Sequence, residues 1–439
     1  MKKAPSSIQK PRRKSRKVVV ANVVSNEQRI IMPWETSRWE IIKRECSREV
    51  SNALEFEAMM AAIRTYRVKP QSITSQFDAY KQLDNPPVPY ATLFVAIAHA
   101  CDAVLNGPKL FRGHSLRICR EGNVTFTTEQ SACVVAMMWF GLFDYDYVSP
   151  GTVPMSEFSD PNMIAGSVFL LGCIACYFVG GPVTTRKIII KRTLAQVPNW
   201  AECEARIVEP LIGDLTAHHD DSYAPAIWVS SHEYLGGDLF TEAITQEEIM
   251  LAVRPDALLI VLFCPRLHDD VVTVFGARKY SQYAGIGSSL RCVAPYNDPT
   301  LGDTLARTCM IFADAGKKTT LESQMNDFDR DLNKAHSGMS SIPPGNVSAF
   351  TWTYGYNHSP HDVKFLQLLL AASVRGCTLE YFPVGRDYEE YIEPFMAWLH
   401  TEHVTVGELY DLYYQCLEYI DEMQMRLSDV KLLDMFMDA

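Results

Sequence analysis

The sequence predicts an α/β protein in which a sheet is flanked by helices and an added helical part precedes the sheet. In the second half of the chain, short and nearly continuous apolar runs alternate with segments of helical periodicity. That alternation is typical of layered α/β folds whose strands are buried on both faces. In the first half, apolar residues recur at helical spacing instead. A chain of 439 residues is long enough for two or three domains.

Residues 1–30 are predicted to form a flexible basic tail. The first seventeen residues hold eight lysines and arginines and no acid, and residues 10–17 read KPRRKSRK. Such a run is typical of a nuclear-import signal, a nucleic-acid-binding patch or a solubilising tail. It has no apolar stretch beside it and therefore does not resemble a secretory signal peptide. The other 33 basic residues face 52 acidic ones, which argues against direct readout of DNA by the folded body.

Residues 31–195 are predicted to be a mostly helical accessory part. Amphipathic periodicity covers residues 47–66 and 89–105, and Thr127 followed by Gln130 predicts a capping box at the start of a buried helix. The run from Pro161 to Thr185 carries no charge. Its length fits a membrane span. It also fits a buried core helix that ends at the glycine pair before Pro182, and this second interpretation is favoured because the run is single and lacks aromatic residues at both ends.

The twelve cysteines lie without any regular spacing from Cys46 to Cys416. In a chain this long, that distribution indicates reduced thiols in an intracellular protein rather than a disulfide framework. Cys173 and Cys176 form a C-x-x-C pair inside the uncharged run. With no second pair nearby, they are better explained as small thiols in a buried helix than as zinc ligands or a redox pair.

Residues 196–439 are predicted to hold the sheet. Nearly continuous apolar runs predict short strands at residues 224–229, 257–264, 271–277, 308–315 and 378–385. Helical periodicity predicts helices between them and after them, at residues 245–253, 321–336, 362–375, 393–402 and 407–427.

The stretch YLGGDLFTEAITQEEIML, residues 234–251, carries the candidate chemistry. It connects the strand at 224–229 with the helix that starts at Gln246, and ligands of such folds bind where strands end and helices begin. Glycines allow the backbone to approach a ligand closely, and the N–H groups at a helix start attract anions. Glu247 and Glu248 are adjacent on the helix and splay by about 100°, so they can hold neighbouring oxygens of one sugar.

The glutamate pair has two possible interpretations, one catalytic and one structural. Cleavage of a glycosidic bond needs an acid that protonates the leaving oxygen, and a glutamate whose pKa is raised by burial can serve. A helix N-terminus opposes that shift because it stabilises the ionised form. Alternatively, Thr245 and Glu248 form an ordinary capping box, which many helices have without any chemistry.

Several motifs together resemble the poly(ADP-ribose) glycohydrolase family, over about residues 126–420. The signature of glycines, a spacer and Gln-Glu-Glu occurs here as GGD, seven residues and QEE. The other motifs follow in the family's order: VPNWAECEARI (197–207), ARKYSQYAGI (277–286), LNKAHSG (332–338), NVSAF (346–350) and VTVGELYDLYYQ (404–415). The resemblance implies a macrodomain-like mixed sheet flanked by helices, with an added N-terminal helical part. The domains implied are a tail at 1–30, a helical part at 31–195 and a catalytic-type core at 196–439.

The resemblance also implies roles for individual residues. Glu248 would be the general acid, Glu247 would hold ribose hydroxyls, and Gln246 would support the loop. Substrate binding would further involve Gly236, Gly237, Tyr283 and Gly285. No metal and no cofactor are implied. The implied partners are poly(ADP-ribose) or ADP-ribosylated proteins, with no membrane, in the nucleus or the cytoplasm.

The chain departs from the family pattern around the ligand. Asp238 replaces the third glycine, Val229 and His232 replace an aspartate and an asparagine, and aliphatic residues replace aromatic ones at Ile286 and Val384. Residues 353–362 stand where the family has a glycine-rich loop that holds the diphosphate. Gly355 is the only glycine of that loop retained here. These changes predict weaker ADP-ribose binding, because stacked rings carry much of a nucleotide's binding energy. They leave two functions: a divergent glycohydrolase, or a catalytically degenerate protein with an ADP-ribose-binding, structural or interaction role.

The remaining polar motifs are predicted to be solvated rather than functional. His218, His219, Asp220 and Asp221 have the side-chain types of a metal site, but four consecutive polar residues are more typical of a loop surface. Residues 358 and 361 are histidines that could contact a diphosphate or simply be exposed.

Overall fold

The computed structural model describes residues 29–64, 71–112, 116–143, 164–181, 186–213, 224–236, 245–285, 289–296, 309–314, 321–350, 361–382, 386–425 and 430–438. The predicted basic tail lies almost entirely outside these residues. The same is true of the histidine and aspartate run at 218–221 and of His358.

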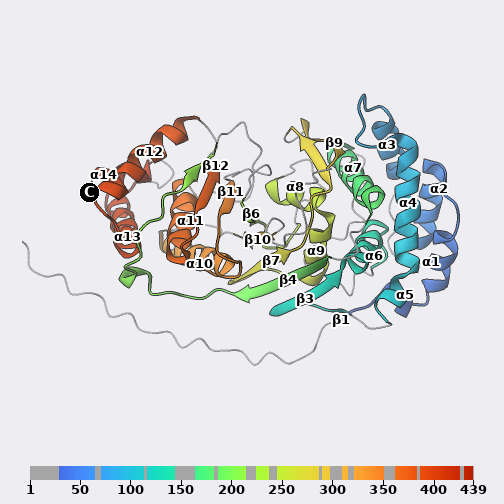
Figure 1. The fold of residues 1–439 in the computed structure, drawn as a ribbon, viewed down its shortest axis with the longest axis horizontal. Coiled ribbons are helices and arrows are strands. Elements are labelled where there is room, and N and C mark those ends of the chain that lie inside the picture. Colours follow the sequence, from blue (N-terminus) through green and yellow to red (C-terminus); the bar gives the residue numbers. More distant parts are fainter. Residues whose placement is uncertain are drawn as a thin grey trace, which may run out of the picture.

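An eight-stranded mixed sheet forms the middle of the molecule (Figure 1). In spatial order its strands are β3 (Gly122–Thr127), β4 (Lys187–Leu194), β7 (Asp270–Phe275), β10 (Cys309–Asp314), β6 (Ala226–Ser231), β11 (Val347–Phe350), β12 (Leu379–Phe382) and β5 (Leu211–Ile212). Pairing is parallel from β10 through β6 to β5 and antiparallel from β3 to β10. The predicted mixed sheet flanked by helices, with a helical part ahead of it, is confirmed.

The two faces of the sheet carry separate hydrophobic cores, because successive side chains of a strand point to opposite faces. In β6, Ile227 and Val229 belong to the first core, while Ala226 and Trp228 belong to the second. The helices that cover the first face contribute to one core with the helical part of the chain. The site described below therefore lies between the central strands and the helical part.

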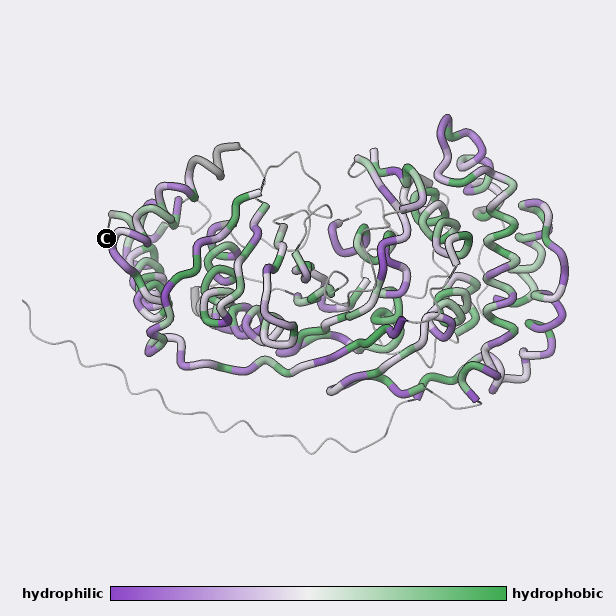
Figure 2. Tube along the Cα trace, in the orientation of Figure 1, coloured by the Kyte–Doolittle hydropathy of each residue, from purple (hydrophilic) through white to green (hydrophobic). Residues whose placement is uncertain are grey.

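The helical part covers one end of the sheet and appears on the right of Figure 1. Its helices are α1 (Trp39–Cys46), α2 (Ala53–Ile63), α3 (Gln71–Lys81), α4 (Tyr90–Leu105), α5 (Gly107–Leu110), α6 (Thr128–Trp139) and α7 (Ile164–Gly180). Figure 2 shows apolar residues gathered along the inner helices of this part, with polar residues toward the outside. Helix α7 packs on α3 and α4 and also touches α8 and β9, so it connects this part with the sheet.

The second face is covered by α10 (Leu321–Ser340) and α11 (His361–Arg375), which pack against each other. Beyond them lie α12 (Arg386–Thr401), α13 (Val406–Glu422) and α14 (Leu432–Asp438), on the left of Figure 1. A short strand pair outside the main sheet joins β1 (Arg29–Ile30) to β2 (Leu116–Arg117). A second pair, β8 (Ser281–Ala284) with β9 (Arg291–Pro295), lies beside α7 and α8.

Most predicted elements agree with the structure, including the capping box of Thr127 and Gln130 at the start of α6. Residues Ile164–Gly180 of the uncharged run form α7, which has 17 residues and contributes to the first core. Within the described ranges, no helix combines the length and apolarity needed to cross a membrane. All twelve cysteines are free thiols, and Cys173 and Cys176 are buried in α7 as expected.

The predicted strand at 257–264 is wrong. Residues Pro255–Leu258 form a 3-10 helix and Leu259–Phe263 form α9. Every residue from Ala257 to Cys264 is buried, so the run is apolar on all sides and shows no helical period. A short apolar run of this kind does not distinguish a strand from a buried helix. Two strands, β3 and β4, also lie before residue 195 and extend the sheet into the range predicted to be mostly helical.

Candidate active site

Helix α8 (Gln246–Val253) begins beside the end of β6, and its first turn holds the candidate acids. Thr245 is the N-cap, with an extended backbone (φ −90°, ψ 179°). Its backbone N–H donates to Oε2 of Glu248 at 2.6 Å, and its hydroxyl donates to the same oxygen. The side chain of Glu248 is 1% exposed. The capping box considered from the sequence is therefore present, and Glu248 is part of it.

Glu247 holds the loop that leads out of β6. Its Oε2 accepts a hydrogen bond from the backbone N–H of His232 at 2.8 Å, and its Oε1 accepts one from Gly236 at 2.7 Å. The side chain is 2% exposed. Hydrogen bonds from backbone N–H groups to a buried carboxylate are strong and directional, so this residue fixes the position of residues 232–236 relative to α8.

Gln246, the first residue of α8, is buried, and among the described residues neither its amide oxygen nor its amide nitrogen has a hydrogen-bond partner. Burying an amide without a partner costs about 1–3 kcal/mol. This amide lies at the head of a helix, next to two buried carboxylates. A bound polar molecule could supply its missing hydrogen-bond partners.

Gly236 is a glycine for two structural reasons. Its φ is +79°, which is the left-handed region that other residues rarely adopt. A Cβ at this position would lie 2.7 Å from Cγ2 of Val261 in α9. The loop therefore packs closely on the helix that the sequence predicted to be a strand.

The same loop is anchored from its outer side. Arg266 forms an ion pair with Glu233, and its guanidinium lies 5.3 Å from the ring centre of Tyr234. The backbone N–H of Leu267 donates to the carbonyl of Glu233 at 2.7 Å. His232 accepts a hydrogen bond at Nδ1 from the N–H of Tyr234, so its ring is turned along the loop.

Tyr283 and Gly285 lie on the β8–β9 ribbon, and β8 packs beside α8. Tyr283 is half-buried against the first core. Gly285 has φ +79°, and a Cβ there would lie 2.2 Å from the carbonyl oxygen of Ser289, so this glycine makes the turn of the ribbon possible. The structure thus brings the predicted residues of α8, Gly236 and this ribbon into one region of the fold. Gly237, Asp238, Ile286, Val384 and residues 351–360 lie outside the described residues.

Val229, which stands where the related family has an aspartate, is fully buried in the first core within β6. It therefore acts as a core residue in this chain.

One buried polar cluster beneath α8 was not predicted from the sequence. Asp256 is completely buried and accepts hydrogen bonds at Oδ1 from Ser131 (2.6 Å) and Tyr177 (2.7 Å). Burial raises the pKa of Asp256, and these two hydrogen bonds oppose the shift. Tyr280 packs edge-on against Tyr177, and its backbone N–H donates to the last residue of α8, Val253. The cluster joins α6 and α7 to the segment that carries Tyr283.

Two family-like motifs contact each other on the second face. Nε1 of Trp200 donates to Asn333 in α10 at 2.8 Å, and the N–H of Gln196 donates to Ser337 at 2.7 Å. These residues hold the chain after β4 onto α10. Their role in the described structure is therefore to assemble the fold.

The described residues contain no group of three or more His, Cys, Asp or Glu side chains placed to hold a metal ion. The head of α8 holds two buried carboxylates that accept hydrogen bonds from backbone N–H groups and a hydroxyl. Beside them lies the amide of Gln246, which no described residue pairs with. Such an arrangement can supply an acid and several acceptors to a polyhydroxylated molecule.

Comparison with known proteins points to one family. Residues 197–390 match the family described as "Poly (ADP-ribose) glycohydrolase (PARG), Macro domain fold". Poly(ADP-ribose) glycohydrolase 1 of Arabidopsis thaliana is 31% identical over 116 residues, which is 25% of this chain and 20% of that protein. Probable poly(ADP-ribose) glycohydrolase 2 of the same plant is 29% identical over 110 residues, 24% of this chain and 21% of the relative. The aligned part thus spans about a fifth of each relative's length.

Proposed function

We propose that this chain, whose residues 197–390 belong to the poly(ADP-ribose) glycohydrolase family with the macro domain fold, hydrolyses the ribose–ribose glycosidic bonds of poly(ADP-ribose). Glu248 is the general acid in this proposal. The observation that supports it most directly is the head of α8, where Gln246, Glu247 and Glu248 are all buried and the described part of the chain offers no hydrogen-bond partner to the amide of Gln246.

The proposed reaction breaks the bond between the anomeric carbon of one ribose and the oxygen of the next. Glu248 gives its proton to the leaving oxygen as that bond breaks, and positive charge develops on the ribose ring. Water adds its oxygen to the anomeric carbon, and the proton that this water loses restores the acid. Glu247, held in place by the loop, accepts hydrogen bonds from ribose hydroxyls, and Gln246 pairs with the substrate or the loop around it.

The decisive test compares two glutamates that occupy the same kind of capping box. Glutamine can accept the hydrogen bond from the N-cap N–H, as Gln130 does for Thr127 at 2.9 Å, but it cannot donate a carboxylic proton. Glu248→Gln should therefore keep the helix start and lower the release of ADP-ribose from labelled poly(ADP-ribose) by about 100-fold or more. The matched control is Glu408→Gln in α13, where Glu408 accepts from Thr405 at 2.8 and 2.9 Å. That variant should keep full activity.

Equal activity of the wild type and Glu248→Gln would remove Glu248 as the acid. Equal losses in Glu248→Gln and Glu408→Gln would show that the effect comes from helix capping and not from chemistry.

A second function is supported by the same contacts. Glu247 holds a loop and Glu248 caps a helix, so both residues have structural roles that do not need catalysis. A catalytically degenerate protein that binds ADP-ribose, or serves a structural or interaction role, fits this observation. No ADP-ribose release by the wild type, together with calorimetric binding of ADP-ribose, would support a binding protein. Under either function, the triple change Asp238→Gly, Ile286→Tyr and Val384→Phe should tighten ADP-ribose binding, because it restores ring stacking and removes a negative charge.

A further inference from the structure

Neighbouring cysteine thiols occur at three places in the described part of the protein. The groups are Cys46 with Cys101, Cys173 and Cys176 with Cys292, and Cys119 with Cys264. All of these residues are buried free thiols that belong to the first core. A thiol reacts through its ionised form, so the three groups differ in reactivity according to the charges and hydrogen bonds around them.

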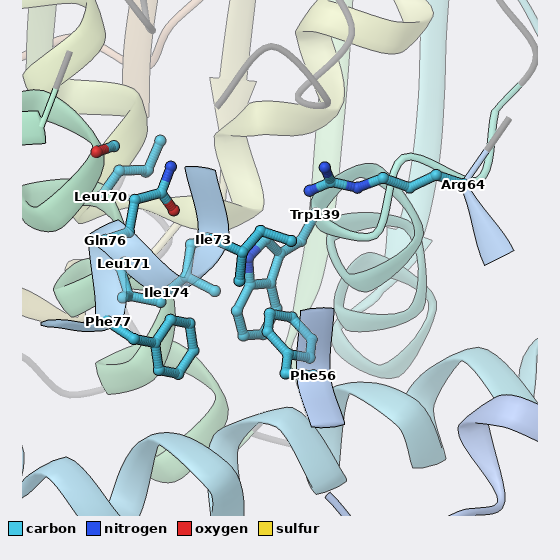
Figure 3. Close-up of a pocket in the computed structure, with 10 residues that line it drawn as sticks. Phe56, Arg64, Ile73, Gln76, Phe77, Trp139, Leu170, Leu171 and Ile174 are labelled. Carbon is cyan, nitrogen blue, oxygen red and sulfur yellow. The ribbon is translucent and has the colours of Figure 1, made fainter. Parts of the chain in front are cut away.

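The first two groups lie within the helical part or where α7 meets β9. Figure 3 shows aromatic and aliphatic side chains of α2, α3, α6 and α7 packed against one another in this part. The pKa of Cys101 is raised by its hydrogen bond with Cys46 and by burial. The pKa of Cys176 is raised by its hydrogen bond with Cys292 and by burial. These thiols therefore keep their protons at neutral pH and are inert.

The backbone holds Cys119 next to Cys264. The N–H of Cys119 donates to the carbonyl of Phe263, the preceding neighbour of the second cysteine, at 2.7 Å. The thiol of Cys264 hydrogen-bonds to that of Cys119. The rings of Phe263 and Phe126 lie 4.9 Å apart, measured between their centres, and this contact fixes β3 against α9. The two sulfurs therefore meet through segments that are both packed in the core.

A buried arginine lies beside this pair. Arg192 is 5% exposed and forms an ion pair with Asp270. Its guanidinium also donates to the carbonyls of Pro265 (2.7 Å) and Arg266 (2.8 Å), which directly follow the second cysteine. A fixed positive charge therefore lies next to the chain that carries the thiols.

The two thiols of this pair differ in acidity. The pKa of Cys119 is lowered by the hydrogen bond from Cys264 and by the charge of Arg192, while burial and the charge of Asp270 oppose the shift. The pKa of Cys264 is raised by the same hydrogen bond and by burial. One thiol thus ionises readily beside a second thiol that keeps its proton, as in a pair of attacking and resolving cysteines.

Cys119 lies close to the protein surface. Its sulfur is 3.8 Å from the carbonyl oxygen of Gly122, and the residues Arg120, Glu121 and Gly122 are all exposed. A small oxidant such as a peroxide therefore needs only a slight opening of this segment to reach the sulfur.

The chain on both sides of Cys264 contacts the loop of the candidate active site. Arg266 forms an ion pair with Glu233, and the N–H of Leu267 donates to the carbonyl of Glu233 at 2.7 Å. Before the cysteine, Val261 of α9 lies against Gly236, where an added Cβ would be 2.7 Å from its Cγ2. A displacement of Cys264 therefore acts on the loop at two points.

We propose that Cys119 and Cys264 form a reversible disulfide in the presence of a peroxide, and that this bond displaces the loop at residues 232–236. A disulfide places its sulfurs about 2.05 Å apart, which is much closer than two hydrogen-bonded thiols. Closing that gap draws Cys264 toward Cys119 and strains the contacts between the following segment and the loop. This inference does not depend on the proposed glycohydrolase activity.

The proposed oxidation takes two steps. In the first, the thiolate sulfur of Cys119 bonds to one oxygen of hydrogen peroxide, the O–O bond breaks, and the departing hydroxide takes up a proton to become water. In the second, the sulfur of Cys264 bonds to that of Cys119, the S–O bond breaks, and the departing hydroxide takes the proton of the Cys264 thiol. The two sulfurs lose two electrons and the peroxide gains them, so two thiols and one peroxide give one disulfide and two waters.

The test exposes the reduced full chain to hydrogen peroxide and identifies the cross-linked cysteines by differential alkylation and peptide mass spectrometry. We expect a cross-link between Cys119 and Cys264 that forms at least about tenfold faster than any cross-link of Cys101 or Cys176. Dithiothreitol should reverse it by thiol–disulfide exchange. Hydrogen exchange at the amides of Gly236 and Leu267 should become faster on oxidation and return to its former rate on reduction.

Three serine variants separate the roles of the thiols. Cys119→Ser should form no cross-link at Cys264, and peroxide should leave its loop amides unchanged. Cys264→Ser removes the resolving thiol, so Cys119 should accumulate as a sulfenic acid that dimedone traps. The matched control is Cys101→Ser, which removes a thiol of another buried pair and should oxidise like the wild type.

Four results would overturn the proposal. The first is absence of a cross-link between Cys119 and Cys264 after peroxide treatment. The second is a cross-link within either of the other two groups that forms equally fast. The third is unchanged exchange of both loop amides in the cross-linked protein. The fourth is absence of sulfenic acid at Cys119 in a folded Cys264→Ser variant, which decides the question even if Cys119→Ser does not fold.

Discussion

Two groups of buried carboxylates lie near the ends of the central strands, and they are stabilised in different ways. Around α10, Asp314 at the end of β10 and Asp331 on α10 are paired with cations: Arg330 contacts both, Lys334 contacts Asp314, and Lys364 contacts Asp331. At the head of α8, Glu247 and Glu248 accept hydrogen bonds from backbone N–H groups and a hydroxyl. Figure 1 shows α10 and α8 on opposite sides of the central strands.

The difference separates a structural cluster from a candidate site. A carboxylate that is paired with a buried lysine is fixed as an anion, and its main effect is on stability. The contacts described for Glu247 and Glu248 come from neutral donors, and a carboxylate can accept or release a proton at such contacts without leaving a buried cation behind. Proteins break local rules mostly at functional sites, and the unpartnered amide of Gln246 falls in the second group.

The largest expected effect comes from breaking the α10 cluster. Lys334 is fully buried, and burial lowers its pKa, while Asp314 opposes the shift. Asp314→Asn leaves that lysine without its carboxylate, and removing one partner of a buried pair typically costs 3–5 kcal/mol. We expect a loss of about 3–5 kcal/mol in the free energy of unfolding, measured by urea denaturation at pH 7.

The control for that loss is Glu40→Gln. Glu40 pairs with Lys43 at 2.6 Å on α1, but its side chain is 80% exposed, and exposed pairs contribute roughly 0–1 kcal/mol. A similar small change in both variants would mean that the α10 cluster is not the structural element we infer.

The second effect concerns the two adjacent glutamates. Glu247 accepts one N–H at each oxygen, whereas glutamine offers one oxygen and an amide N–H₂ that would face the other donor. Glu247→Gln should therefore destabilise the protein by about 2–3 kcal/mol. The amides of His232 and Gly236 should exchange hydrogen faster. Glu248→Gln keeps its capping hydrogen bond and should change stability by less than about 1 kcal/mol. The reverse order would show that Glu248, not Glu247, has the larger structural role.

The comparison also shows what could be predicted from the sequence. The helix start at Thr245 follows from a local spacing of three residues, and so does the one at Thr127, because a capping box is a contact within one turn. The wrong prediction of a strand at 257–264 has a different cause, because no contact within one turn decides the structure of this run. Its apolar residues face protein on every side, and only the position of the surrounding elements makes it a helix.

The missed polar contacts join segments that are far apart in the chain. Ser131 and Asp256 are 125 positions apart, Trp200 and Asn333 are 133 apart, and neither pair has a local signal. Resemblance to a family drew attention to the motifs that hold Trp200 and Asn333, but only the structure shows that these residues bind each other. The lack of a hydrogen-bond partner for the Gln246 amide among the described residues is likewise a property of three-dimensional packing.

A smaller effect is expected at the loop that Glu247 holds. Gly236→Ala places a side chain at φ +79° and a Cβ 2.7 Å from Val261, which together should cost about 1–2 kcal/mol. Gly376→Ala is the matched control, because Gly376 has φ +64° and no atom within 4 Å of the added Cβ. The difference between the two variants isolates the contact with Val261. No difference would mean that the loop moves away without loss.

The last effect should appear only when the pH is changed. Asp256 differs from the carboxylates at α10 and at the head of α8. It is completely buried and accepts hydrogen bonds from the hydroxyls of Ser131 and Tyr177. Asp256→Asn keeps an acceptor for both hydroxyls and removes the titration. The new amide N–H₂ would take the place of Oδ2, which accepts no hydrogen bond at normal distance from the described residues.

The sign of the pH effect follows from the raised pKa of Asp256, which burial causes. A group with a raised pKa in the folded state binds its proton more tightly there than in the unfolded chain, where an aspartate titrates near pH 4. Its contribution to stability is therefore complete below about pH 4 and is lost as the pH rises through the folded pKa. We expect the unfolding free energy of the wild type, relative to Asp256→Asn, to fall as the pH rises from about 4 through the raised pKa of the folded state. The fall should be about 1.4 kcal/mol for every tenfold by which folding tightens proton binding at this carboxyl. Urea denaturation of both proteins across this range measures the difference. A constant difference would mean that Asp256 remains ionised in the folded protein, and the cluster beneath α8 would then join the α10 cluster as a fixed anionic site.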